Sequence, residues 1–160
     1  MTLATPTLST RPILGDFSSV VCFKAVITGV EDTLGPDGAA VAFTRAGRVR
    51  GHQLARDLGL SNAALPDSEL SSRLDAALGA QGTRLCAVRS VTRDGDRLIV
   101  DTQETVCSAG EPQGSDRKCT FTLGAVQGAI EEITGQMLMA EHTDSVLRGS
   151  QYDRFEFTPL

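Results

Sequence analysis

The chain has 160 residues, which is enough for one domain with its own hydrophobic core. Hydrophobic residues make up 41% and charged residues 22%, as in ordinary globular proteins. A formal net charge of −5 argues against nucleic acids and anionic membranes as partners, since it offers no general attraction to phosphate. The N-terminus lacks the basic and apolar blocks of a signal peptide, and no apolar run reaches the roughly 18 residues of a membrane span. We therefore expect a flexible arm over residues 1–12 and a single cytoplasmic domain over residues 13–160.

The first third of the chain predicts two helices. Asp16 is a suitable N-cap, and apolar residues then recur every three or four positions up to Gly35-Pro36, where this helix should end: Phe17, Val20, Val21, Ile27, Val30 and Leu34. A second helix follows over about residues 38–58, with five candidates for burial: Val41, Phe43, Val49, Leu54 and Leu58. Gly47 and Gly51 interrupt it, which indicates a bend or a close approach to another backbone or to a ligand.

The middle of the chain predicts a third helix and then a change to strand periodicity. Pro66-Asp67 opens the helix, whose apolar face is Leu70, Leu74, Ala77 and Leu78. Residues 84–92 and 97–107 then alternate, and the Asp94-Gly95 pair between them is typical of a tight hairpin turn. The polar segment that follows, up to Lys118, is the best candidate for a mobile flap.

The last third predicts one long helix and a closing hairpin. Val126, Ile130 and Ile133 share one face of the helix, while Gly124 and Gly128 lie four apart on the neighbouring face. Strands over residues 137–147 and 152–157 follow, joined around Gly149. The order predicts an α+β fold, in which N-terminal helices pack on an antiparallel sheet and one long helix stands between two β-hairpins.

The four cysteines, Cys22, Cys86, Cys107 and Cys119, form no CxxC pair, so neither a zinc ribbon nor a thioredoxin-type motif is present. In a cytosol they should be reduced and should pack as small hydrophobic residues. The alternative is a thiol that lines a pocket or senses redox state.

Three glycine-marked motifs occur in a specific order. The first is AGRVRGHQLA over residues 46–55; the second is Cys119, Phe121, Gly124 and Gly128; the third is Gly149, Arg154 and Phe155. Their order and spacing resemble the 4-vinyl-reductase-like family of small-molecule-binding domains, over roughly residues 13–157. The resemblance implies a fold shared with haem nitric-oxide-binding domains and with small subunits of Golgi transport complexes. It also implies an apolar cavity between helices and sheet, binding of hydrocarbons, acyl chains or tetrapyrrole precursors, and a homodimer.

The chain departs from this family where the family often has a pair of cysteines, four residues before and four after the closing glycine. Counted from Gly149, these positions are Ser145 and Asp153. A hydroxyl and a carboxylate cannot reproduce a pair of soft thiolates. His142 and Asp144 are close in sequence, but such residues on a hairpin more often face solvent. We therefore predict no metal and no cofactor.

The candidate ligand-binding residues combine aromatic side chains, one thiol and the glycine faces: Phe23, Phe43, Cys119, Phe121, Gly47, Gly51, Gly124 and Gly128. His52 is a candidate polar anchor for a carboxylate or propionate at the cavity mouth, with an arginine beside it. The alternative is a solvated basic helix face. Glu131 and Glu132 point about 100° apart on a helix, so we expect one of them to face solvent.

Familiar catalytic motifs are absent from the sequence, including GxSxG, the P-loop and HExxH. The favoured function is therefore non-enzymatic binding of a small apolar molecule by a sensor or carrier. One alternative is a homodimeric interaction module whose core is filled by its own side chains. A less favoured one is an enzyme of tetrapyrrole or hydrocarbon metabolism.

Overall fold

The computed structural model describes residues 10–160, so most of the expected N-terminal arm lies outside the described residues. Helix α1 (Val20–Asp57) is followed by α2 (Asp67–Leu78) and a hairpin of β1 (Ala87–Asp94) and β2 (Arg97–Gln103). Helix α3 (Thr120–Thr134) leads to β3 (Leu138–Asp144), the short 3₁₀ helix η1 (Val146–Arg148) and β4 (Asp153–Pro159). The predicted α+β class is confirmed. No helix within residues 10–160 is both long enough and apolar enough to cross a membrane.

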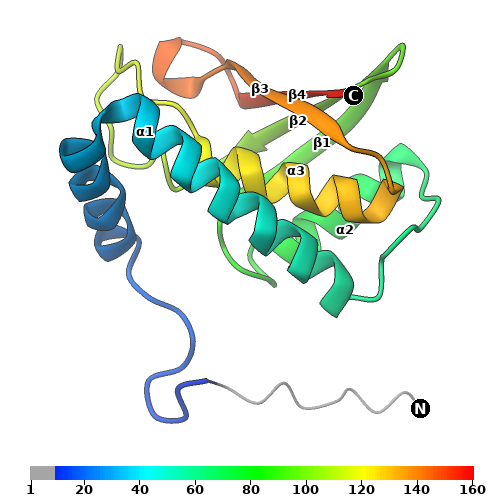
Figure 1. Cartoon of the computed structure of the whole chain (residues 1–160), viewed down its shortest axis with the longest axis horizontal. Coiled ribbons are helices and arrows are strands. Elements are labelled where there is room, and N and C mark those ends of the chain that lie inside the picture. The colour runs from blue at the N-terminus through cyan, green and yellow to red at the C-terminus, as the bar shows by residue number, and fades with distance from the viewer. Residues whose placement is uncertain (1–9) are drawn as a thin grey trace.

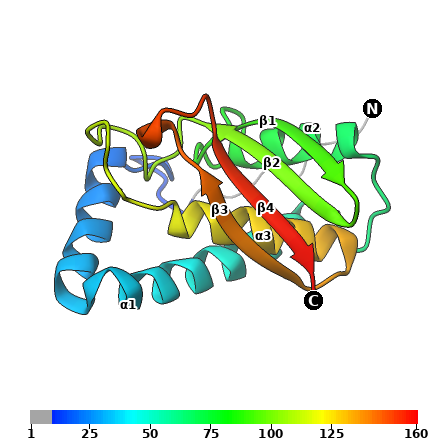
Figure 2. The ribbon, with the colours of Figure 1, turned by 90° about the horizontal axis from the view of Figure 1, so that it is seen from above.

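The four strands form one antiparallel sheet in the order β1-β2-β4-β3, so the two hairpins join through β2 and β4. Helix α3 lies between this sheet and the second half of α1, while α2 lies beside β1 (Figures 1 and 2). Asp153, Phe155 and Phe157 alternate along β4 and form its inward face, because all three are fully buried. Two of these three are aromatic and contribute to the central core.

Helix α1 is two helical segments joined at a kink, as the Gly35-Pro36 pair predicts. Gly35 has φ 74° and ψ 162°, outside the helical region, and Pro36 cannot donate a backbone hydrogen bond. The start of α1 differs from the prediction. Ser19, not Asp16, is the N-cap, since its side chain accepts the Val21 amide at 3.2 Å.

Several residues expected in the core of α1 are exposed. Of the predicted stripe in the first segment only Ile27 is buried. In the second segment Val41, Val49 and Leu58 are exposed, whereas Ala39, Gly47, Gly51 and Ala55 are buried. The buried face therefore consists of small residues, because this face touches another helix at very short range.

The expected flap after β2 also differs from the prediction. Its first four residues, from Thr105 to Ser108, are buried. Its later part is tied to α1 by ion pairs: Lys24 with Glu111 at 2.6 Å and Arg117 with Glu31 at 2.5 Å. We conclude that this loop is part of the packed structure.

Candidate functional site

A cavity of about 520 Å³ lies among α1, α3 and the connections before and after the first hairpin. Proteins commonly bind small molecules in cavities of about 300–1,000 Å³. Most of its lining is apolar, including Leu54, Leu78 and Val106. The lining includes no residue of the four strands, so the cavity lies between helices and loops and not against the sheet.

An aromatic pair forms one end of the cavity. Phe23 comes from the first segment of α1 and Phe121 from the first turn of α3, and both were predicted from the sequence. Their ring centroids are 5.4 Å apart and their planes meet at 81°, an edge-to-face arrangement. The kink at Gly35 turns the first segment of α1, which places Phe23 against α3. The two rings offer an apolar contact surface to a ligand.

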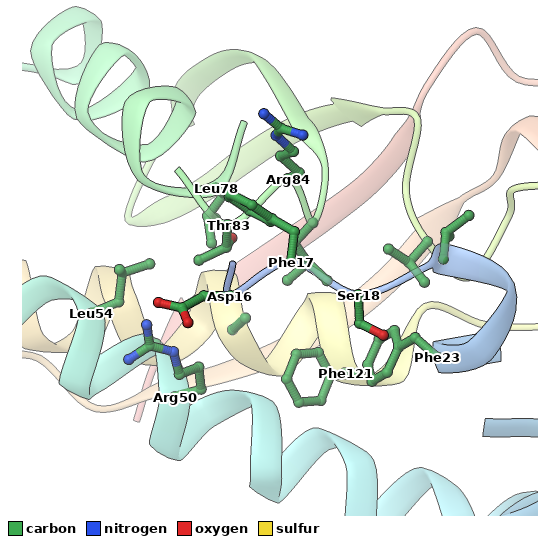
Figure 3. A pocket seen from close by; sticks show the side chains of 15 residues that line it. Asp16, Phe17, Ser18, Phe23, Arg50, Leu54, Leu78, Thr83, Arg84 and Phe121 are labelled. Carbon is green, nitrogen blue, oxygen red and sulfur yellow. The ribbon is translucent and has the colours of Figure 1, made fainter. Parts of the chain in front are cut away.

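A third aromatic residue, Phe17, lies across the cavity on the extended segment before α1 (Figure 3). The guanidinium of Arg84 lies 4.3 Å from the centroid of this ring, which is a cation–π contact. Arg84 has a φ of 57°, in the left-handed region that residues with a side chain seldom adopt. This backbone strain lies at the edge of the cavity, where strained residues often have a function.

Two charged residues lie at the end of the cavity away from the aromatic pair. Figure 3 shows the Asp16 carboxylate and the Arg50 guanidinium there, pointing toward one another. The hydroxyl of Thr83 also belongs to the lining and is buried without a hydrogen-bond partner among the described residues. The cavity is therefore apolar in most of its lining and polar at one end.

The predicted glycine faces lie in the contact between α1 and α3. Gly47 and Gly51 lie against the α3 backbone at Phe121, Ala125 and Ala129, and Gly124 and Gly128 lie against the α1 backbone at Thr44 and Arg48. A Cβ atom added at Gly124 would lie 2.9 Å from the Arg48 nitrogen and even closer to the Thr44 carbonyl oxygen. Only Gly51 of the four also lines the cavity. The other predicted residue of α1, Phe43, packs partly buried against the core and is not in the lining.

His52 does not lie at this cavity. Its ring nitrogens are 3.0 Å from Glu131 Oε2 and 3.0 Å from Glu132 Oε2 on α3. Arg48 donates two hydrogen bonds to Glu131, at 2.7 and 2.8 Å, and Arg56 pairs with Glu132 at 2.9 Å. Hydrogen bonds from Arg56, then Ser61 and His52, lower the pKa of Glu132 to about 2. The expectation that one glutamate simply faces solvent is therefore wrong, since both hold α3 against α1.

Cys119 lies at the start of α3 and is joined to Cys107 by a disulfide with a Cα–Cα distance of 5.2 Å. The expectation of four reduced cysteines is therefore wrong for this pair, although Cys22 and Cys86 are free. Burial, and then the nearby Asp75, raise the pKa of Cys86 to about 12, so it is an unreactive thiol. The disulfide connects Cys107, which follows Val106 of the cavity wall, to the helix that carries Phe121.

A buried polar cluster surrounds Asp153, where the resembled family often has a cysteine. Its carboxylate accepts hydrogen bonds from the hydroxyls of Thr105 at 2.7 Å, Ser108 at 2.8 Å and Ser145 at 2.8 Å. Burial by itself raises the pKa of Asp153, but the nearby His142 ring and the hydrogen bonds from these three hydroxyls outweigh it and hold the pKa well below its usual range. The carboxylate is therefore ionised within the core.

His142 completes this cluster. Its Nδ1 accepts the Cys119 amide at 3.2 Å, so in the neutral ring Nε2 carries the proton. Nε2 lies 3.4 Å from Asp153 Oδ1, longer than an ordinary hydrogen bond. His142 and Asp153 are buried, so the expectation that hairpin residues of this kind face solvent is wrong for these two.

These residues are also the chain's candidate metal ligands. Ligand atoms of Cys119, His142 and Asp153 lie within 4.8 Å of one another, and thiolate, imidazole and carboxylate are a donor set that zinc accepts. The Cys119 sulfur is in a disulfide in this structure, so a cation could bind to all three only after reduction. The prediction of no metal stays a prediction.

No protein-family model and no curated protein matches this sequence. Solved structures do match. The phenol-responsive sensory domain of the transcription activator PoxR, with phenol, has a TM-score of 0.69 at 16% identity, over 90% of this chain and 76% of that one. A vinyl-4-reductase family protein from Methanocaldococcus jannaschii has a TM-score of 0.52 at 14% identity, over 92% and 85%.

The fold is that of the vinyl-4-reductase-like domains. A trafficking protein particle complex subunit 3 from Naegleria fowleri, covalently bound to palmitic acid, has a TM-score of 0.57 at 11% identity, over 88% of this chain and 92% of that one. The resemblance drawn from the three glycine-marked motifs is thus confirmed at the level of the fold. The trafficking subunit also confirms the expected relation to transport-complex subunits.

Of the cavity lining only Phe23, Gly51 and Phe121 were among the predicted site residues. The residues that the sequence missed include Asp16, Phe17, Arg50 and Thr83. Asp16 and Phe17 were assigned to a helix that begins only after Ser19. Arg50 is one of several arginines in its helix, and the sequence does not show which of them lines the cavity. Thr83 carries no sequence signal, because its isolation from hydrogen-bond partners is a property of the folded chain.

Proposed function

We propose that this protein is a non-enzymatic domain that binds a small apolar molecule, such as a hydrocarbon, an acyl chain or a tetrapyrrole-like compound, as a sensor or carrier. The observation that carries this proposal is the cavity of about 520 Å³ with its Phe23–Phe121 pair. Removing apolar ligand surface from water would supply affinity of roughly 25 cal/mol per Å². Two proteins of the same fold carry phenol and palmitic acid.

The test is ligand uptake by the full chain. Native mass spectrometry of purified protein and thermal shift across aromatics, fatty acids and tetrapyrroles should show a bound or stabilising apolar compound. Leu54→Trp should fill the cavity and weaken binding by at least about tenfold, or about 1.4 kcal/mol. Val49→Trp is the matched control, since Val49 is an exposed aliphatic residue of the same helix. Apo protein alone, with no thermal shift in any class, would refute the proposal.

A second candidate is the homodimeric interaction module. It is supported by the exposed apolar side chains of the first segment of α1, including Val20, Val21 and Leu34. A core filled by its own side chains is less well supported, because the cavity is roomy enough for a ligand. Dimerisation and ligand binding are compatible, so we propose both. An enzyme of tetrapyrrole or hydrocarbon metabolism has less support, as two neighbours of the same fold are a sensory domain and a trafficking subunit.

The remaining proposals concern the setting of the domain. We propose one domain over residues 13–160 preceded by an arm over residues 1–12. We also propose a cytoplasmic location. The net charge of −5 supports the absence of a nucleic-acid partner.

A further inference from the structure

Acidic side chains hold Arg50 less closely than they hold Arg48 and Arg56 of the same helix. Arg48 and Arg56 pair with glutamates of α3 at 2.7 and 2.9 Å. The one ion pair of Arg50 within residues 10–160 is with Asp57, at 3.8 Å, and both side chains are about half exposed. An exposed pair of this kind contributes little. Within the same residues the Arg50 guanidinium donates no hydrogen bond, so its N–H groups are available at the cavity.

The chain itself places a carboxylate beside this guanidinium. Figure 3 shows Asp16 and Arg50 pointing toward one another at one end of the cavity, with Phe17 lying across it. Asp16 also accepts the backbone amides of Thr10 at 3.1 Å and Arg11 at 2.9 Å, so it has donors of its own. The adjacent Asp16 and Phe17 thus offer the cavity an acid and an aromatic ring.

The other polar groups of the cavity are consistent with an anionic ligand head. The buried Thr83 hydroxyl has no partner among the described residues, and such groups in native proteins call for an explanation. A ligand oxygen would supply the partner. The charged lining residues are Arg50, Arg84 and Asp16, which leaves an excess of one positive charge.

We propose that the cavity binds an amphipathic monocarboxylate, either an aromatic acid or a short acyl acid. Its carboxylate binds the Arg50 guanidinium, its second oxygen reaches the Thr83 hydroxyl, and its apolar body lies against Phe23 and Phe121. Arg suits this role because its planar donors match a carboxylate. This inference rests on the proposed function, and it adds a charge requirement for the ligand.

The experiment compares acids with their neutral amides by isothermal titration calorimetry at pH 7, using the full chain. The pairs are phenylacetate with phenylacetamide and hexanoate with hexanamide. We expect the acids to bind more tightly, and Arg50→Met to weaken acid binding by about 10- to 100-fold, as for hydrogen bonds to charged groups. Arg50→Met should weaken amide binding less than acid binding, and Arg50→Lys should retain part of the preference. Arg73→Met is the matched control, since Arg73 is an exposed arginine outside the cavity.

Asp16→Asn provides a separate test of the charge requirement, because it removes a negative charge from the cavity lining. Removing the internal carboxylate should raise the affinity for phenylacetate several-fold and should change the affinity for phenylacetamide less. Amides that bind as tightly as acids, or an Arg50→Met variant that keeps the acid preference, would overturn this inference while leaving the proposed function intact. Failure of acids, amides and every other apolar class to bind would overturn both.

Discussion

The surroundings of Asp153 show how the core accommodates a carboxylate where the resembled family often has a cysteine. A buried carboxylate is costly unless it is hydrogen-bonded, and Thr105, Ser108 and Ser145 supply three hydroxyl donors. The sequence identified Ser145 and Asp153 as the residues in place of cysteines. It did not identify Thr105 and Ser108 as their partners, because the pairing forms across 48 and 45 positions of the chain.

The Asp153 cluster predicts a specific dependence of stability on pH. The folded-state pKa of Asp153 lies below its unfolded value of about 3.9, so its stabilisation is fully present above that pH and is lost as pH falls through the folded pKa. Asp153→Asn should lower the free energy of unfolding by about 1.5–3 kcal/mol at pH 7. Urea denaturation should show this difference shrinking below about pH 4. Asp144→Asn, a partly exposed control, should have little effect, and a pH-independent difference would contradict the assignment.

The Cys107–Cys119 disulfide predicts a dependence on reductant. The sulfurs close a loop with a sequence separation of 12. Closing a loop of this length stabilises a folded chain by about 2–4 kcal/mol. Thermal unfolding with excess dithiothreitol should therefore occur at a lower temperature than without it. Cys107→Ala with Cys119→Ala should remove the dependence, whereas Cys22→Ser, at an exposed free thiol, should retain it. Equal unfolding temperatures of the wild type with and without dithiothreitol would show that the disulfide does not stabilise the fold.

At the scale of elements, the contact between α1 and α3 explains which predictions succeeded. The spacing of Gly47 with Gly51 and of Gly124 with Gly128 correctly indicates close approach. The spacing does not say whether the sheet, a ligand or another helix approaches these glycines, because the missing side chains allow all three. Apolar periodicity alone wrongly favoured Val41 and Val49 for the buried face, since glycine and alanine contribute little to such a pattern.

The helix contact predicts opposite effects for two glycine substitutions. Gly124→Ala would place a methyl group against the Thr44 and Arg48 backbone, so it should lower the free energy of unfolding by about 1–3 kcal/mol or more. Gly29→Ala is the matched control, as it lies within α1 with nothing near its added Cβ. It should be neutral or stabilising by up to about 1 kcal/mol, the helix preference for alanine. Urea denaturation of both variants checks this, and similar effects would contradict the packing.

At the scale of the whole molecule, the first segment of α1 extends beyond the sheet and α3 (Figures 1 and 2). Ion pairs from Lys24 and Glu31 attach it to the loop after β2. Val21 is 72% exposed and Val26 55% exposed on the same segment. The sequence predicted an apolar stripe here, and the first helix is a possible dimer face under the homodimer alternative. Little of the stripe is buried within one chain, so its exposed side chains are available to contact a second copy of the chain.

The exposed face of α1 predicts that this protein forms a dimer through its first segment. Val21→Glu should shift the protein toward monomer, because a stable interface buries about 800 Å² per partner and tolerates no unpaired charge at its centre. Val41→Glu is the matched control, since Val41 is 73% exposed on the second segment of the same helix. Sedimentation equilibrium of wild type and both variants measures the shift. A monomeric wild type at high micromolar concentration would rule the dimer out, and an equal shift in both variants would place the interface elsewhere on α1.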